Sequence, residues 1–248
     1  MVIKETILEQ LSKTSNEISL EIDKLYSIEI EEIAEEMAFN YQLLENIINR
    51  EDQTTISDED FQAALLLWTA LNTYLSAVEL FRRGYVKEPP MLIRNILEIV
   101  CASYDLHCNP DKLKILRERP NDFDSKKSIK ISKKINPIVA KMWGMLSSNY
   151  SHVSVMHTVP HQKGLCIGGL FNIRDQKNTI CGLLPPLNLT IESLGSITEL
   201  IFINQIKKPR FWIKQTNGDL IATMPDKNRI RGQRLQKMLE NELNINKI

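Results

Sequence analysis

The first 83 residues contain neither glycine nor proline, although the chain of 248 residues has 9 glycines and 10 prolines. All of these backbone breakers fall between Gly84 and Gly232. A stretch of this length without a breaker, rich in Glu, Leu, Ile and Lys, predicts helices. The low total of glycine and proline also excludes collagen-like and linker-dominated chains.

Long apolar runs, signal sequences and paired cysteines are missing too. No segment reaches the roughly 18 consecutive apolar residues that a membrane span needs, and the first residues lack the regions of a secretory signal. The four cysteines, Cys101, Cys108, Cys166 and Cys181, form no CxxC pair. We therefore expect reduced thiols in a cytoplasmic protein without membrane contact, rather than a zinc site or a disulfide framework.

The charge balance conceals two parts of opposite sign. The chain has 31 basic and 31 acidic residues, but residues 1–60 carry 16 acids and 4 bases, whereas residues 61–248 carry 15 acids and 27 bases. One interpretation is a set of solvated helical faces that differ in sign. The other is an acidic segment that lies against the basic remainder of this chain or of a second copy, or that mimics a ligand for it.

Capping signals and apolar periodicity divide the chain into elements. Ser57 followed by Asp60 fits a capping box, Gly84 fits a C-cap, and Pro89-Pro90 fit a helix start. The expected helices are a short first one, one to about residue 50, and others over about 58–83, 89–107, 137–146 and 190–206, with a last one from Asp226. Residues 111–134 are polar and basic.

Two β-hairpins are expected after Pro160. The first joins the runs 165–167 and 179–181, and the second joins 210–214 to 220–223 through Asn217-Gly218, which fits a type I′ turn. We predict a mainly α fold, a helical bundle of about six or seven helices with one or two small β-hairpins in the C-terminal third. Its regions are acidic helices over 1–56, a central bundle over 57–161, and an α+β part over 162–248 packed on that bundle.

One helix carries three ionisable residues on a single stripe. Arg94, Glu98 and Asp105 lie within about 40° of one another around the axis at 100° per residue. Charges on an otherwise apolar helix are costly unless paired, so we expect a satisfied network or the lining of a cavity. A structural Arg94–Glu98 pair and a functional pocket both remain open.

Histidines gather near the middle of the chain. Three of the four, His152, His157 and His161, follow the segment that contains Asn149, Tyr150 and Ser151. Histidine serves as acid, base or metal ligand near neutral pH, but this spacing matches no standard zinc signature, so we expect no metal. A structural role for His152 remains an alternative to catalysis.

Basic segments supply the remaining candidates. Residues 112–134 and 207–237 have net charges of +6 and +7, and Arg210 beside Phe211 and Trp212 offers the cationic and stacking groups used by single-strand binders. RNA is therefore a candidate partner. The chain lacks the GxxxxGK[ST], GxGxxG and GxSxG motifs, so we expect no nucleotide cofactor and no other cofactor.

Two segments carry a family resemblance. The hairpin Leu80-Phe-Arg-Arg-Gly-Tyr85 with Pro89-Pro-Met-Leu-Ile-Arg-Asn-Ile-Leu-Glu98, followed by Leu146-Ser-Ser-Asn-Tyr-Ser-His152, resembles bacterial helical proteins with an RxxxE helix and a Ser/Tyr-rich helix ending in His. More distantly, residues 60–160 resemble the HEPN superfamily of helical toxin and defence ribonucleases. HEPN nucleases typically place Arg four to six residues before His on one helix; here Arg94 would have to approach His152 from a neighbouring helix.

Two functional hypotheses follow. The first is an intracellular, bacterial-type helical protein, homo-oligomeric, that acts through binding or oligomerisation without a clear catalytic centre. The second, implied by the resemblance, is a HEPN-like, metal-independent endoribonuclease of a toxin or phage-defence type. In it His152 would act at the RNA 2′-hydroxyl, Arg94 would stabilise phosphate charge, and Glu98 and Asp105 would orient Arg94.

Overall fold

The computed structural model describes residues 15–49, 56–151 and 180–245, with single positions before residue 15. This part of the chain is mainly helical, which confirms the predicted fold class. The α-helices are α2 (Ser15–Leu25), α3 (Ser27–Ile48), α4 (Asp58–Arg82), α5 (Glu88–Cys108), α6 (Lys112–Glu118), α7 (Ser125–Ser132), α8 (Pro137–Leu146), α10 (Leu184–Ile201) and α11 (Asp226–Ile245). They are joined by the 3-10 turn η3 (Pro120–Asp122), the π-helical turn η4 (Ser147–Ser151), and the strands β1 (Trp212–Lys214) and β2 (Leu220–Ala222).

The predicted antiparallel helix pair is α4 and α5. The Ser57 hydroxyl accepts a hydrogen bond from the Asp60 N–H at 3.2 Å and caps α4. After α4 the chain turns at Gly84, whose φ of 77° is one that L side chains rarely adopt. Prolines in the first turn then start α5, where a missing N–H costs nothing. Local sequence signals therefore set both ends of this pair.

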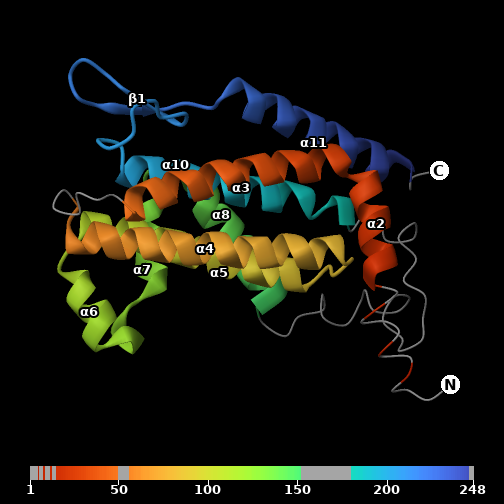
Figure 1. Ribbon diagram of the computed structural model, residues 1–248, viewed down its shortest axis with the longest axis horizontal. Coiled ribbons are helices and arrows are strands. Elements are labelled where there is room, and N and C mark those ends of the chain that lie inside the picture. The colour runs from red at the N-terminus through yellow and green to blue at the C-terminus, as the bar shows by residue number, and fades with distance from the viewer. Residues whose placement is uncertain are drawn as a thin grey trace.

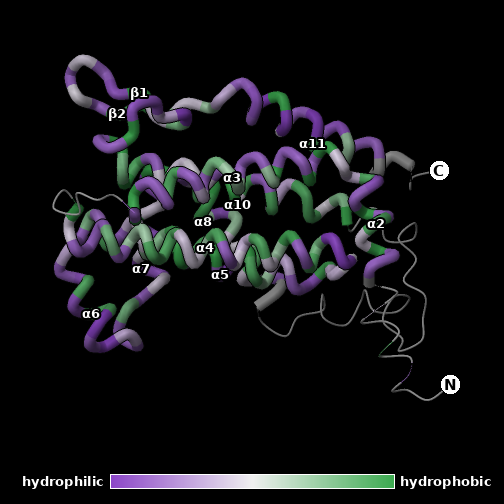
Figure 2. Tube along the Cα trace, in the orientation of Figure 1, coloured by the Kyte–Doolittle hydropathy of each residue, from purple (hydrophilic) through white to green (hydrophobic). Residues whose placement is uncertain are grey.

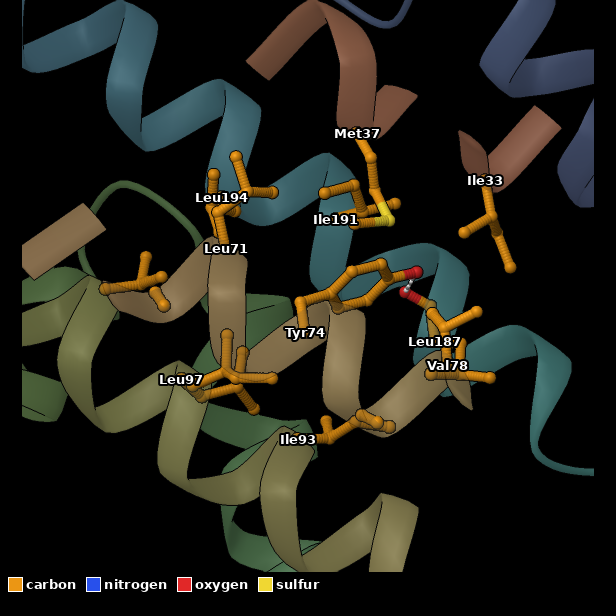
Figure 3. Packing of buried hydrophobic residues seen from close by; sticks show 14 of the residues in the cluster. Ile33, Met37, Leu71, Tyr74, Val78, Ile93, Leu97, Leu187, Ile191 and Leu194 are labelled. Carbon is orange, nitrogen blue, oxygen red and sulfur yellow. Dashed lines mark hydrogen bonds between the residues drawn. The ribbon is translucent and has the colours of Figure 1, made fainter. Parts of the chain in front are cut away.

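The core lies where α4 and α5 meet α3 and α10. Figure 1 shows α4 and α5 side by side, with α3 and α10 running along them and α11 on the outside. Figure 2 shows hydrophobic residues concentrated on the inner helices, whereas α11 is largely hydrophilic. In Figure 3 the fully buried Tyr74 of α4 lies among apolar side chains and donates its hydroxyl hydrogen to the Leu187 carbonyl oxygen of α10, at 3.0 Å.

Helix α4 is long and apolar enough to cross a membrane by length and composition. In the fold, however, one side of α4 belongs to the core, where Ala63, Leu67, Leu71 and Phe81 are fully buried. The contact between α4 and α5 is more extensive than the contact between any other two elements in the described chain. Leu65 and Leu75 of the same helix stay exposed, so burial in the core explains only part of the apolar character of α4.

Several local predictions need correction. The polar segment 111–134 forms α6 and α7, which raises the number of α-helices to nine in the described residues. Ile180 and Cys181, expected in a strand, are helical, and α10 begins at Leu184 rather than near residue 190 because its prolines occupy the first turn. The rest of the first predicted hairpin, residues 165–179, lies outside the described residues.

The second predicted hairpin is present, with Trp212 opposite Ala222 and Ile213 opposite Ile221. Its turn is not type I′, because only Gly218, at φ 91°, has a positive φ there, whereas type I′ requires two such residues. Instead the Gly218 N–H donates to the Gln215 carbonyl at 3.0 Å and the Gln215 N–H to the Asp219 carbonyl at 2.8 Å. This is a longer loop that needs only one glycine.

Candidate functional site

Arg94 and Glu98 lie together on α5, as the sequence predicted, and α8 completes their surroundings. The Arg94 guanidinium pairs with the Glu98 carboxylate at 2.9 Å, and its Nε donates to the Ser147 hydroxyl at 2.9 Å. The Trp143 indole N–H donates to the same Glu98 oxygen at 2.8 Å. The Arg94 Cζ also lies 5.6 Å from the Trp143 ring centroid, in cation–π range. We call these four residues the Arg94 cluster.

The Arg94 cluster is partly exposed, since 29% of the Arg94 side chain and 22% of the Glu98 side chain remain accessible to solvent. A guanidinium has five N–H donors in one plane. In the described chain two partners, Ser147 and Glu98, take up part of this set. The cluster therefore combines a fixed orientation with N–H donors that these two partners do not use, which is an arrangement that can bind phosphate or carboxylate.

Asp105 shares the stripe but not the cluster. Eleven residues separate it from Arg94, about 16 Å along a helix axis. Its fully buried carboxylate accepts hydrogen bonds from Asn109 Nδ2 at 2.8 Å, Lys112 Nζ at 2.5 Å and Ser128 Oγ at 2.7 Å. The three residues of the stripe therefore belong to two separate networks. Asp105 holds α6 and α7 against α5 and does not orient Arg94.

The segment expected to hold the histidine follows directly from Ser147. Residues 147–151 form the π-helical turn η4, a rare conformation that is frequent at functional sites. Asn149 lies half-buried in this turn. Tyr150 and Ser151 complete its backbone, whereas their side chains, His152 and the later histidines lie outside the described residues. Arg94 thus contacts the residue from which this turn starts.

Arg210, expected at a nucleic-acid surface, forms a network of contacts with α3 and α10. Its guanidinium pairs with Glu36 of α3 at 3.0 Å and lies 3.4 Å from the centroid of the Phe39 ring. The Glu199 carboxylate of α10 accepts the backbone N–H groups of Arg210 and Phe211 at 2.8 and 2.7 Å. These contacts hold the start of the hairpin against α3 and α10.

The same network continues to Arg231 of α11, whose side chain is only 2% exposed. It donates to Glu36 at 2.9 Å and to Asn188 at 2.7 Å, and Arg234 pairs with Glu32 one turn further on. Acidic α3 therefore lies against basic α11 within one chain. This is one of the two arrangements that the charge asymmetry predicted.

Trp212, the other predicted stacking residue, is 7% exposed, and its indole N–H donates to the Ser196 carbonyl at 2.8 Å. It does not offer a free face for a base. It forms instead a wall of a groove of about 180 Å³, which we call the hairpin groove. The groove is lined by Ile135, Asn136, Pro137, Ile138, Leu189, Glu192, Ser193, Ser196, Phe211, Trp212, Ala222, Thr223 and Met224.

Glu192 is the acidic group of the hairpin groove. Burial raises the pKa of its carboxyl, while Asn188, which donates at 2.9 Å, and Arg231, at 3.7 Å, oppose that rise. A buried carboxyl beside aromatic walls is a common feature of binding sites. In the described residues, no group of three or more His, Cys, Asp or Glu side chains could hold a metal ion.

Sequence reasoning missed the partners that give these sites their shape. Trp143 and Ser147 lie some 50 residues after Arg94, and neither differs by pattern from an ordinary apolar or polar helix residue. Ser147 is the first serine of the predicted Ser/Tyr-rich segment, and this position was the one feature of the sequence that could have pointed to it as a partner of Arg94. Arg231 and Glu36 lie 195 residues apart. The sequence gives no sign of their contact beyond the opposite charges of the two ends of the chain.

No family model matches the chain, and comparisons with curated proteins and with solved structures find no match either. We therefore take the function from the contacts of the described residues.

Proposed function

We propose that this protein binds a phosphate-bearing ligand at the Arg94 cluster, and that the ligand is RNA. The observation that carries the proposal is the set of contacts of Arg94, a partly exposed guanidinium fixed by Glu98, Ser147 and the Trp143 ring. A fixed guanidinium loses less side-chain entropy on binding than a mobile one. Trp143 places an aromatic surface next to it.

A row of cations on α7 supports RNA over a small anion. Helix α7 and the turn after it expose Lys126, Lys130, Lys133 and Lys134, for which no ion pair is present in the described part of the chain. The first three recur at steps of four and three residues, which places them on one side of α7. Helix α7 packs on α5, where Ser128 contacts Asp105, and Asp105 lies about 16 Å along the helix axis from Arg94. Such a row suits a charged polymer better than a single phosphate.

Fluorescence anisotropy with a labelled single-stranded RNA tests this proposal. Arg94→Met should weaken binding by roughly tenfold to 100-fold, because hydrogen bonds to charged groups contribute about 1.5–3 kcal/mol. Arg229→Met is the matched control, since Arg229 is an exposed arginine that pairs only with Asp226 in the described residues. Equal affinities for wild type and Arg94→Met would exclude the Arg94 cluster as the site.

A metal-independent endoribonuclease is the second candidate. The observation that favours it is the bond from Arg94 to Ser147, because Ser147 starts the π-helical turn that leads to His152 five residues later. In this candidate His152 takes the proton of the 2′-hydroxyl as that oxygen attacks phosphorus. The 5′-oxygen then leaves and takes up a proton, a 2′,3′-cyclic phosphate forms, and Arg94 stabilises the phosphate charge.

Incubation with tRNA or mRNA in the presence of a chelator separates the two candidates. If the chain is a ribonuclease, the wild type cleaves RNA and His152→Ala does not, although His152→Ala still binds. If it only binds, neither protein cleaves and both bind with equal affinity. Glu98→Gln should weaken binding in both cases, because it removes the charge that orients Arg94.

A further inference from the structure

The hairpin groove is a partly apolar concave surface that the proposed RNA site at Arg94 does not include. Its floor is α10 and its walls include the rings of Phe211 and Trp212. Its rim carries two large apolar side chains open to solvent, Ile138 at 46% and Met224 at 57% exposure. Exposed apolar side chains around a concavity mark interaction sites in soluble proteins, and methionine adapts to the shape of what it contacts.

The rim of the hairpin groove is also basic. Lys133 and Lys134 directly precede Ile135, and Lys141 follows Ile138 by one turn on the exposed side of α8. In the described chain none of these three lysines has an ion-pair partner. The acidic group inside the groove, Glu192, is offset by Arg231 at 3.7 Å. An occupant of this groove therefore has an apolar residue flanked by acids.

The same chain carries a surface of that chemistry at α2 and the start of α3, on either side of the bend at Tyr26. Leu20 is 71% exposed, the highest value for a large apolar side chain in the described residues, and Leu25 and Ile28 are exposed as well. Glu17, Glu21 and Glu31 are exposed acids for which no ion pair is present in the described chain, and Lys24 is the one cation among them. We call this surface the acidic corner.

The acidic corner and the hairpin groove cannot meet within one molecule. Figure 1 shows α2 and the hairpin at opposite ends of the long axis. Two copies lying antiparallel would instead bring each corner to the other copy's groove, and this two-fold arrangement closes with two identical contacts. We infer that the hairpin groove binds the acidic corner of a second copy, with Leu20 seated between Met224 and Ile138.

This dimer does not depend on the Arg94 cluster, so Arg94→Met should leave it intact. The groove rim shares Lys133 and Lys134 with the proposed RNA surface, and the substitutions that test the dimer avoid both lysines. Within one molecule, acidic α3 already pairs with basic α11. The dimer would pair acidic and basic surfaces in the same way at the acidic corner and the groove rim, which the contact of α3 with α11 does not use. Because the corner and the groove rim are charged and exposed, rising salt should weaken the dimer. Because both surfaces supply apolar side chains, high salt should not abolish it.

Sedimentation velocity over a range of protein concentrations tests the inference. The wild type should form a dimer, and Leu20→Asp and Met224→Asp should each weaken it by roughly tenfold or more, because each places a charge at an apolar contact. Both positions are exposed, so both variants should unfold at the wild-type denaturant midpoint. Ile213→Asp is the matched control, an equally exposed residue next to Trp212 on the opposite face of the hairpin.

Mixing the two weakened proteins identifies the partner surface. Leu20→Asp keeps an intact groove and Met224→Asp keeps an intact corner, so an equimolar mixture should restore a dimer through one unaltered contact. A monomeric wild type would overturn the inference, as would a dimer insensitive to both substitutions. Loss of the dimer in Met224→Asp alone, without recovery on mixing, would indicate groove-to-groove pairing and would overturn it as well.

Discussion

The buried pair between Arg231 and Glu36 gives the sharpest test of what holds the two charged ends of the chain together. Both side chains are only 2% exposed, and their nearest charged atoms are 2.9 Å apart. Replacing Arg231 with Met keeps the apolar volume but removes this donor from Glu36, Glu32 and Asn188. Glu36 then keeps only Arg210, at 3.0 Å, among its charged partners in the described residues. Removing one partner of a buried ion pair costs about 3–5 kcal/mol, because the other charge remains buried.

We expect Arg231→Met to lower the free energy of unfolding by about 3–5 kcal/mol, measured by urea denaturation. Glu36→Gln should cost less, since Arg231 keeps Glu32 at 3.3 Å and Asn188 as partners. The double variant should be less destabilised than the sum of the two single variants. Removing both partners leaves no unpaired charge at this contact, whereas each single variant leaves one. The matched control is Arg229→Met, two residues away on α11, whose exposed pair with Asp226 should contribute under about 1 kcal/mol.

An equal, small loss for Arg231→Met and Arg229→Met would refute the reasoning. It would mean that Arg231 is hydrated in solution, and that the contact between α3 and α11 depends on its apolar residues alone. Strict additivity in the double variant would refute the direct coupling, because residues in one network should deviate from additivity by about 0.5–3 kcal/mol.

Three further predictions concern pH, thiols and packing. Burial raises the pKa of Glu192 above 4.5, so this carboxyl contributes stability below that pH and loses the contribution as pH rises through its pKa in the folded protein. The free energy of unfolding of the wild type relative to Glu192→Gln should therefore fall with rising pH. A difference that stays constant or grows with pH contradicts this prediction. Burial raises the pKa of Cys101 to about 12, so a thiol reagent should label exposed Cys108 rapidly and Cys101 only on unfolding; Cys108→Ser should remove one fast equivalent, and Cys101→Ser should remove none. Gly195→Ala would place a Cβ 3.1 Å from the buried Asn40 amide oxygen, and we expect a loss of about 1–3 kcal/mol in chemical denaturation, whereas Gly232→Ala, with open space around it, should lose none.

Local patterns in the sequence predicted those parts of the fold that depend on near neighbours. The span of α4, its Ser57 cap, the turn at Gly84 and the proline start of α5 all follow from groups within a few residues. The Arg94–Glu98 pair was predictable for the same reason, since residues four apart meet on one helix. The helices α6 and α7 were not recognised, because a polar, basic segment has a weak apolar pattern.

Tertiary structure alone decided which charges face one another and which face solvent. Arg210 and Trp212 looked like a nucleic-acid surface, yet Arg210 pairs with Glu36 of α3 and Trp212 is buried against α10. Asp105 shared a stripe with Arg94, but distance along the axis gave it other partners. Composition established that the two parts of this chain differ in charge, and left open whether they are solvated faces or lie against each other. Only the fold determined that Glu36 and Arg231 are the buried pair, because a contact across 195 residues depends on packing and not on local sequence.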